Sequence, residues 1–484
     1  MYEALNFVDG REQPPLAGLF RPVVAPATGE EIGRMAWSGP EDVTAACDAA
    51  TSAAGGWAAI GYAERATMLR AWGVAITARR EEIALADAMD SGTPIRTMRT
   101  GIGKGLDYLD YFTGLWPELQ GTTIPASPGN LHYTVREAYG PVGIVIPFNH
   151  PGFFAVSKTV PALMAGNSVV VKPSDLTPVS AHLIAQAAEG ILPPGVFNVV
   201  QGGADVGQAI VADRRLRRLH FTGGIRTGLA VQRGAADSGV VKQVTMELGG
   251  KNPLIVFPDV DPAVAAKAAV DGMNFTRNQG QSCGSTSRLF VHADIAAEVV
   301  DAVCDQVARI QLGLPDAEDT EMGSLVSHDH QRRVLGVVSR ASAEGARLRI
   351  GGQAAGGALE RGAYVQPTVF TDVTDQMAIA REEIFGPVLS VLRWTDEADM
   401  LRQVNASDYG LAAAIYTSDL GAALSTAAAV EAGYVWVNTV ETRWKGTPFG
   451  GYKDSGTGSE HDLDEMLGYT RLKSVNVVLP PRLP

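Results

Sequence analysis

The chain has 484 residues, of which 46% are hydrophobic and 19% charged, as in a globular protein large enough for several domain-sized cores. The formal net charge of −13 disfavours a nucleic-acid-binding protein, because such a protein normally carries a basic face. No secretory leader and no apolar run of membrane-spanning length (~20 residues) is recognisable, and three cysteines are too few for a disulfide framework. We therefore expect a cytoplasmic protein with reduced thiols and with neither a nucleic-acid nor a membrane partner.

The first part of the chain changes from strands to helices. Residues 5–37 are rich in turn residues, and the pair Asp9-Gly10 between two short segments predicts a β-hairpin. From Pro40 to about Ser91 the apolar residues recur with helical spacing, and the same pattern predicts a helix over residues 95–114.

Two segments far apart in the sequence have the alternation of strands at a sheet edge. The first is residues 132–137, within the turn-rich strip 119–138, and the second is residues 474–479. Edge strands need a partner for their free backbone groups. Pairing across a subunit interface and pairing within the chain both satisfy that need.

From Gly140 onward, short apolar strands alternate with helices. Three of the expected strands are Val142–Ile146, Ser168–Lys172 and Leu219–Phe221. This alternation predicts an α/β fold with a parallel sheet covered by helices, and ligands at the carboxyl ends of its strands. A second α/β set is expected over residues 294–440.

A glycine-rich turn follows the strand that ends at Phe221. Its residues, Gly223-Gly224-Ile225-Arg226-Thr227-Gly228, do not form the G-x-G-x-x-G fingerprint. They do place glycines where a strand turns into a helix, whose first N–H groups could face a phosphate. An ordinary strand–helix turn is the alternative reading.

The stretch Asn278-Gln279-Gly280-Gln281-Ser282-Cys283-Gly284 places a cysteine behind amide side chains and between glycines. A lone cysteine is usually a packing residue, and Cys47 and Cys304, which lie in helical patterns, are expected to be packing residues. Cys283 differs because Glu247 and Asn149 could supply a base and an amide donor. The three together would suit covalent chemistry at a carbonyl.

Seven blocks, in one order, then identify a resemblance. Over nearly its full length the chain resembles the NAD(P)-dependent aldehyde dehydrogenase superfamily. The matching blocks are PFNHP (147–151), VVVKPSD (169–175), FTGG (221–224), ELGGK (247–251), NQGQSC (278–283), EEIFGPV (382–388) and PFGGYKDSG (448–456).

The resemblance implies an aldehyde dehydrogenase-like α/β fold with three parts. A Rossmann-type dinucleotide-binding domain would comprise residues 1–118 and 139–247, and an α/β catalytic domain residues 248–448. A small β oligomerisation arm would use residues 119–138 together with the C-terminal segment 449–484. A homodimer or homotetramer is therefore expected.

The resemblance also implies catalytic roles. Cys283 matches the nucleophile, which would attack an aldehyde to give a thiohemiacetal and, after hydride transfer, a thioester. Asn149 matches the oxyanion-hole amide, and Glu247 matches the residue that activates water to hydrolyse the thioester. The implied activity is oxidation of an aldehyde to its carboxylic acid. No metal site is predicted.

Six positions match the family's cofactor site, namely Lys172, Asp175, Gly223, Gly224, Glu383 and Phe385. Lys172 would contact the adenosine ribose and Glu383 the nicotinamide ribose. Asp175 stands where many NAD-using members carry Glu, and an acid there would repel a 2′-phosphate. We therefore expect NAD, with NADP as the alternative.

The substrate pocket is expected to include His150, Phe153, Phe154, Arg443 and Trp444. Further candidates for its wall are Phe275, Arg277 and Glu441. An aromatic wall favours an aryl or medium apolar aldehyde. Arg443 and Lys445 leave open an aldehyde that bears a carboxylate.

Two other functions are weighed against hydrolytic oxidation. Family members that transfer the acyl group to coenzyme A generally lack the glutamate of the ELGGK block, which is present here as Glu247. A catalytically silent ligand-binding protein on the same fold would usually lack the nucleophile or the cofactor residues, and this chain retains both. Hydrolytic aldehyde oxidation is therefore the prediction.

Overall fold

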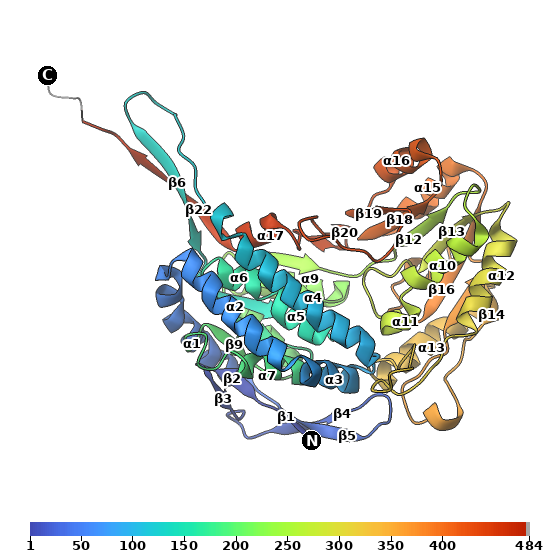
Figure 1. The fold of residues 1–484 in the computed structure, drawn as a ribbon, viewed down its shortest axis with the longest axis horizontal. Coiled ribbons are helices and arrows are strands. Elements are labelled where there is room, and N and C mark those ends of the chain that lie inside the picture. Colours follow the sequence, from blue (N-terminus) through green and yellow to red (C-terminus); the bar gives the residue numbers. More distant parts are fainter. Residues whose placement is uncertain (481–484) are drawn as a thin grey trace.

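The computed structural model describes residues 1–480 and contains two large sheets, each covered by helices (Figure 1). Within these residues the first sheet has eight strands in the order β21-β11-β10-β7-β8-β9-β2-β3, and its five central strands, β11 to β9, are parallel. The strands are β2 (Asn6–Val8), β3 (Arg11–Gln13), β7 (Pro141–Val145), β8 (Ser168–Lys172), β9 (Phe197–Val199), β10 (Arg218–Thr222), β11 (Gln243–Glu247) and β21 (Gly456–Thr457). The predicted hairpin at Asp9-Gly10 joins β2 to β3.

Helices cover both faces of this sheet. They are α1 (Pro40–Ala59), α2 (Tyr62–Ala78), α3 (Arg80–Ser91), α4 (Ile95–Gly114), α5 (Pro151–Ser157), α6 (Val160–Met164), α7 (Val179–Gln186), α8 (Ala204–Ala212), α9 (Ile225–Asp237) and α17 (Leu463–Leu467), with a short 3₁₀ turn over Trp116–Glu118. Two buried tryptophans connect the long helices α1 and α2 to shorter ones. The indole N–H of Trp57 donates to the Leu163 carbonyl of α6 at 2.9 Å, and that of Trp72 donates to the Ile184 carbonyl of α7 at 3.1 Å. Gly92, at φ +78°, ends α3 in the left-handed conformation that glycine tolerates best.

The second sheet has seven strands in the described residues, ordered β14-β15-β16-β13-β12-β18-β19. They are β12 (Pro253–Val256), β13 (Arg288–His292), β14 (Arg347–Ile350), β15 (Thr368–Thr371), β16 (Val388–Trp394), β18 (Ala412–Tyr416) and β19 (Tyr434–Val437). Alternate residues of β12 enter different cores, since Leu254 and Val256 belong to one apolar cluster and Ile255 to another. Both faces are therefore buried, as the continuous apolar run predicts.

Helices pack against each face of the second sheet and complete the two cores. One core receives α10 (Pro262–Gly272) and α12 (Ala296–Val307), and the other receives α13 (His328–Ala343), α14 (Ala378–Arg381) and α15 (Glu397–Asn405). The remaining elements are α11 (Phe275–Asn278), α16 (Leu420–Ala429), a 3₁₀ turn (Gly357–Leu359), the sheet β1 (Tyr2–Ala4), β5 (Glu31–Ala36), β4 (Phe20–Val24), and the pair β17 (Tyr409–Gly410), β20 (Tyr452–Lys453).

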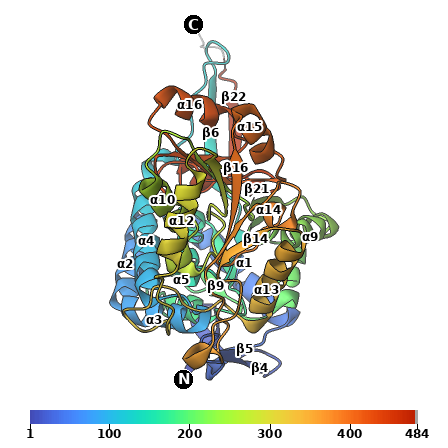
Figure 2. The same ribbon diagram turned by 90° about the vertical axis from the view of Figure 1, so that its right-hand side faces the viewer.

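A two-stranded ribbon projects from the body (Figures 1 and 2). β6 (Leu131–Ala138) pairs antiparallel with β22 (Thr470–Val477) of the same chain, from Leu131 opposite Val477 to Ala138 opposite Thr470. The two predicted edge segments are thus each other's partners. The second strand begins at Thr470, four residues before its predicted start, because the pairing continues as far as β6 does.

The carboxyl ends of strands in the first sheet face the amino ends of strands in the second sheet. In the first sheet, β10 and β11 lie in register so that Thr222 pairs with Glu247 at their carboxyl ends. In the second sheet, the segments that precede β12, β13 and β16 contain Gly250, Cys283 and Glu383, at the amino ends of the strands. The prediction of ligands at carboxyl ends therefore describes only the first sheet. The α/β fold class is confirmed.

Candidate active site

The Cys283 segment is held by backbone geometry and by one asparagine. Asn274 and Gln279, at φ +61° and +58°, flank the short helix α11, and Gly280 follows at φ +70°. The Asn252 amide donates to the carbonyl of Cys283 at 2.7 Å and to that of Ser285 at 3.0 Å. These bonds fix the backbone that carries the thiol.

The two glycines of the ELGGK block are explained by close approach. A Cβ on Gly250 would lie 2.7 Å from the Cys283 carbonyl oxygen, and one on Gly249 would lie 2.1 Å from a Glu383 carboxylate oxygen. Neither distance leaves room for a side chain. The block therefore brings the end of β11 against both the thiol segment and Glu383.

Asn149 and Cys283 line the same cavity. The Asn149 side chain is buried, and its amide nitrogen donates one hydrogen bond, to the Gln281 carbonyl at 2.9 Å. An amide nitrogen has two donors, so one remains for a ligand. Among residues 1–480, the Cys283 backbone N–H has no hydrogen-bond acceptor. Two donors are thus available at the site of the thiol.

Glu247 ends β11 and is buried, and in the described residues neither of its carboxylate oxygens has a hydrogen-bond partner. Burial, followed by the charge of Glu460, raises the pKa of Glu247 well above its ordinary value of 4.5. Lys158 acts in the opposite direction but forms a buried ion pair with Glu460. Both carboxylate oxygens of Glu247 are therefore free for another partner.

The predicted cradle for a phosphate lies where β10 meets α9. The N–H of Gly223 donates to the Glu247 carbonyl at 3.0 Å, and a Cβ on Gly224 would meet nothing within 4 Å. The first N–H groups of α9 have no intrahelical acceptor. Open space at the amino end of this helix of 13 residues fits the diphosphate of a dinucleotide.

Lys172 ends β8, and Asp175 follows it. The Lys172 side chain is buried, packs 3.6 Å from the position of a Cβ on Gly207, and donates to the Pro173 carbonyl at 2.8 Å. Burial lowers the pKa of Lys172, while Asp175 and Asp205 act to raise it. Asp175 itself is exposed. A buried amine with one carbonyl partner has further donors for ribose hydroxyls.

Glu383 and Phe385 approach from the second sheet. The Glu383 carboxylate accepts the Gly250 N–H at 3.0 Å, and burial raises its pKa to about 7. Phe385 has a left-handed backbone, at φ +57°, and its carbonyl accepts from His330 at 2.6 Å. The ring of Phe385 lies 5.6 Å from that of Phe148, edge to face. Glu383 and Phe385 of the second sheet therefore contact Gly250 and Phe148, which follow strands of the first sheet.

A cavity of about 720 Å³ opens at Cys283. The predicted residues His150, Phe153, Phe154, Arg443 and Trp444 all line it, as do Arg277 and Glu441. Phe275 does not, because it is completely buried in the core of the second sheet. Burial, with Arg277, Arg443 and Lys104, lowers the pKa of His150 to about 3, so this imidazole is neutral.

Sequence reasoning missed two parts of the cavity wall. One is a face of α4, with Arg96, Lys104 and Tyr108 at helical spacing. The spacing shows one face of a helix, but only the fold shows what that face borders. The other is His461, whose ring lies 4.6 Å from that of Tyr108 and 5.7 Å from that of Phe449. No sequence signal singled out His461.

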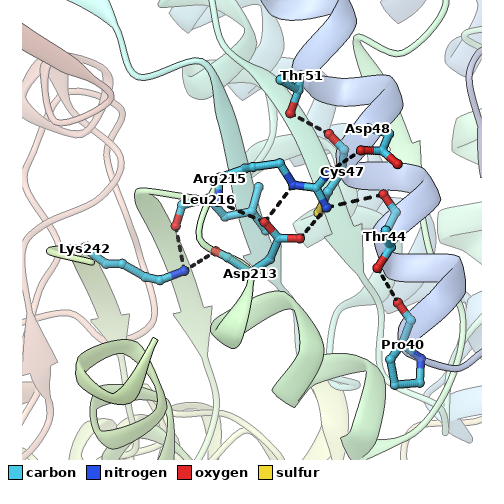
Figure 3. A network of polar contacts seen from close by, with 9 residues as sticks. All are labelled: Pro40, Thr44, Cys47, Asp48, Thr51, Asp213, Arg215, Leu216 and Lys242. Atoms are coloured by element: carbon cyan, nitrogen blue, oxygen red, sulfur yellow. Dashed lines mark hydrogen bonds and ion pairs between the residues drawn. The ribbon is translucent and has the colours of Figure 1, made fainter. Parts of the chain in front are cut away.

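The other two cysteines are in different surroundings. Cys47 is buried in α1 beside the ion pair of Asp213 with Arg215 (Figure 3). Burial, followed by the charge of Asp213, raises the pKa of Cys47 to about 12, so its thiol is inert at neutral pH. Cys304 packs at the edge of the second core, and burial raises its pKa as well. Both behave as packing residues.

Among residues 1–480 no helix is at once long enough and apolar enough to cross a membrane. In the same residues, no three or more His, Cys, Asp or Glu side chains gather as a metal site would require.

Comparison with known proteins agrees with the geometry. The model of the "Aldehyde dehydrogenase family" matches residues 18–475. Aldehyde dehydrogenase tropH of Talaromyces stipitatus is 42% identical over 481 residues, covering 98% of this chain and 93% of the relative. A betaine aldehyde dehydrogenase of Cereibacter sphaeroides is also 42% identical, over 480 residues, covering 99% of this chain and 98% of the relative.

Solved structures show the same fold. An NAD+ complex of aldehyde dehydrogenase from Bacillus cereus superposes with a TM-score of 0.95 at 37% identity, covering 99% of this chain and 97% of that one. A betaine aldehyde dehydrogenase from Staphylococcus aureus, in complex with NAD+, gives 0.96 at 31% identity, covering 100% and 99%.

Proposed function

Because this chain belongs to the aldehyde dehydrogenase family and is an aldehyde dehydrogenase, we propose that Cys283, Asn149 and Glu247 carry out a hydrolytic oxidation. The product is the free carboxylic acid. The observation that carries the proposal is a thiol and two unengaged N–H donors at one cavity, with an unpartnered buried carboxylate whose charge acts on the thiol.

The first step is attack on the aldehyde. The Cys283 thiolate adds to the carbonyl carbon, and the oxygen becomes an anion in the thiohemiacetal. The free amide N–H of Asn149 and the backbone N–H of Cys283 stabilise that oxyanion. Such donors are effective because they are already oriented, and losing one costs about 10²–10³ in rate at comparable sites.

NAD is the cofactor that the cradle fits. The amino end of α9 would hold its diphosphate, Lys172 its adenosine ribose and Glu383 its nicotinamide ribose, while Asp175 disfavours a 2′-phosphate. When bound, NAD+ supplies the hydride acceptor that converts the thiohemiacetal to the thioester on Cys283. The NAD+ complexes of two similar structures support this assignment.

Hydrolysis of the thioester requires a base. Glu247, with both oxygens free, takes the proton of the attacking water. Because its pKa is raised, the Glu247 carboxylate is a stronger base than an exposed glutamate and is better suited to take a proton from water. The thiol then leaves, and Cys283 is regenerated.

The test is a Cys283→Ser variant assayed for NADH absorbance with a panel of aldehydes. We expect no turnover above background, since a serine hydroxyl without an adjacent base is a poor nucleophile. Wild-type turnover by this variant would refute the assignment. Product analysis separates hydrolysis from transfer to coenzyme A. Free acid as the product would support Glu247 as the base that activates water.

The projecting ribbon of β6 and β22 supports assembly into a homodimer or homotetramer. A lone two-stranded ribbon is marginally stable in water, and this one exposes Leu131, Leu472 and Leu479. Coverage by another copy would bury these side chains. Sedimentation of the protein with and without the Leu472→Lys change tests the assembly. A reducing compartment such as the cytoplasm is proposed because it keeps the Cys283 thiol usable.

A further inference from the structure

The positive charge nearest the nucleophile has no carboxylate partner. A guanidinium nitrogen (Nη2) of Arg443 donates a long hydrogen bond of 4.0 Å to the sulfur of Cys283. In the described residues no carboxylate oxygen comes within ion-pairing distance of Arg443, although, against the effect of burial, the charge of Glu441 acts on the guanidinium and raises its pKa. The nearby Glu441 is already bound, since its two oxygens accept from Asn274 at 2.6 Å and from Arg277 at 3.2 Å. Arg443 therefore presents N–H donors to the cavity.

Two contacts hold Arg443 in this position without neutralising its charge. The guanidinium carbon lies 3.9 Å from the centre of the Phe449 ring. Its Nη2 also packs against the backbone at Gly284, where an added Cβ would lie 2.9 Å away. A glycine beside the nucleophile thus leaves room for the guanidinium. A cation stacked on an aromatic face keeps its in-plane N–H groups free for an acceptor.

The side chains that line the cavity carry more positive than negative charges. Five cationic side chains line it, Arg96, Lys104, Arg277, Arg443 and Lys445, against three carboxylates, Asp107, Glu321 and Glu441. Burial lowers the pKa of Lys104, Arg277 and Arg443 lower it further, and Glu441 and Asp107 act in the opposite direction. In a half-enclosed apolar space this excess favours an anionic guest.

We propose that Arg443 is a specificity-determining residue that binds an anionic group of the substrate close to its aldehyde carbon. The inference rests on the proposed function of Cys283. Given the short distance from Nη2 to the sulfur, a hydrogen-bonded acceptor would lie about two to four bonds from the carbon that the sulfur attacks. The substrate class is a short or aryl aldehyde carrying a carboxylate or a comparable oxyanion.

The same geometry disfavours a cationic aldehyde. Betaine aldehyde carries a quaternary ammonium next to its aldehyde carbon, and that charge would face Arg443. Similarity to betaine aldehyde dehydrogenases over the whole chain therefore does not by itself make betaine aldehyde the substrate. We expect betaine aldehyde to be the poorest substrate of a matched set.

Alkylation of Cys283 isolates the contact from turnover and from NAD. The thiolate displaces iodide from iodoacetate, an anion, or from iodoacetamide, its neutral analogue, forming the S–C bond as the C–I bond breaks. Both reagents need the same thiolate, so their rate ratio cancels any change in the pKa of the thiol. Measured against the same ratio for a small free thiol, the wild-type ratio should favour iodoacetate about ten- to a hundredfold, as a charge-assisted hydrogen bond would.

Three variants complete the test. Arg443→Gln should bring the ratio close to that of the free thiol, and Arg443→Lys should retain part of the preference. Lys445→Gln is the matched control, because it removes one positive charge from an exposed position of the same wall. An unchanged ratio in Arg443→Gln, or an equal fall in Lys445→Gln, would overturn the proposal. Labelling that persists in Cys283→Ser is subtracted as reaction at Cys304.

Turnover gives the second readout. We expect wild-type kcat/KM to be higher for 4-oxobutanoate than for neutral butanal and lowest for betaine aldehyde. Arg443→Gln should lower the ratio of the first two by about tenfold or more. Equal ratios in wild type and variant would refute Arg443 as the selector. A Cys283→Ser enzyme that kept oxidising aldehydes would instead refute the proposed function, and the alkylation result would be unaffected.

Discussion

Replacing Glu247 by Gln separates the two halves of the proposed reaction. The change keeps the shape of a side chain that is 4% exposed and removes its ability to take a proton. Attack by Cys283 and hydride loss do not use Glu247, so the thioester should form at close to the normal rate. Its hydrolysis should slow by about 10²–10⁴, the usual contribution of a general base.

Rapid mixing with NAD+ and aldehyde measures both steps. Glu247→Gln should release about one NADH per Cys283 in a burst and then turn over slowly. Wild-type steady-state turnover should rise with pH as Glu247 ionises, and the variant should lose that dependence. A variant with no burst, or with wild-type steady turnover, would show that Glu247 has another role.

The same change has a consequence for stability whose sign follows from the pKa of Glu247. In the unfolded chain this carboxyl ionises near its ordinary pKa of 4.5, whereas the folded protein holds the pKa well above it. Above pH 4.5 ionisation thus favours the unfolded chain, by about 1.4 kcal/mol for each pKa unit of difference. Glu247→Gln should therefore unfold at a higher temperature than wild type at pH 8, with the gain vanishing near pH 4. A constant difference across pH would contradict this account.

Three further predictions follow from the structure. Asn149→Ala should lower kcat/KM by about 10²–10³ while NAD affinity, measured by fluorescence titration, stays the same; a loss confined to NAD affinity would contradict the oxyanion role. Asp175→Ser should raise kcat/KM with NADP relative to NAD, and an unchanged ratio would show that another residue sets cofactor choice. Asp90 is buried in α3, where burial and then the charge of Asp87 raise its pKa well above 3.8, so Asp90→Asn should raise the melting temperature at pH 8 but not at pH 3. Melting curves for both proteins at the two pH values check that sign.

Local signals predict the regular elements well. β8 occupies the predicted residues 168–172, because an apolar run bounded by polar residues is decided within a few residues. The predicted helix over 95–114 is confirmed as α4 for the same reason. The family resemblance identifies Cys283, Asn149 and Glu247 as candidates, and their roles stay predictions until variants are measured.

Properties that depend on long-range packing could not be predicted. The pairing of β6 with β22 depends on the folding of more than 300 intervening residues. The free donors of Arg443 depend on Glu441 being occupied by Asn274 and Arg277. The place of His461 in the cavity depends on its stacking against Tyr108 from α4. None of these is visible in local sequence.

The cavity wall and the thiol segment are built from different parts of the chain. The Cys283 nucleophile and its backbone N–H belong to a segment fixed by Gly250, Asn252 and left-handed turns. Much of the wall comes from one face of α4, the segment 441–445 and His461, and Glu441 links it to the turn at Asn274. Point substitutions in the wall can thus change substrate specificity while the catalytic chemistry is kept. An engineer wishing to convert this enzyme to another aldehyde should start at Lys104, Arg443 and His461.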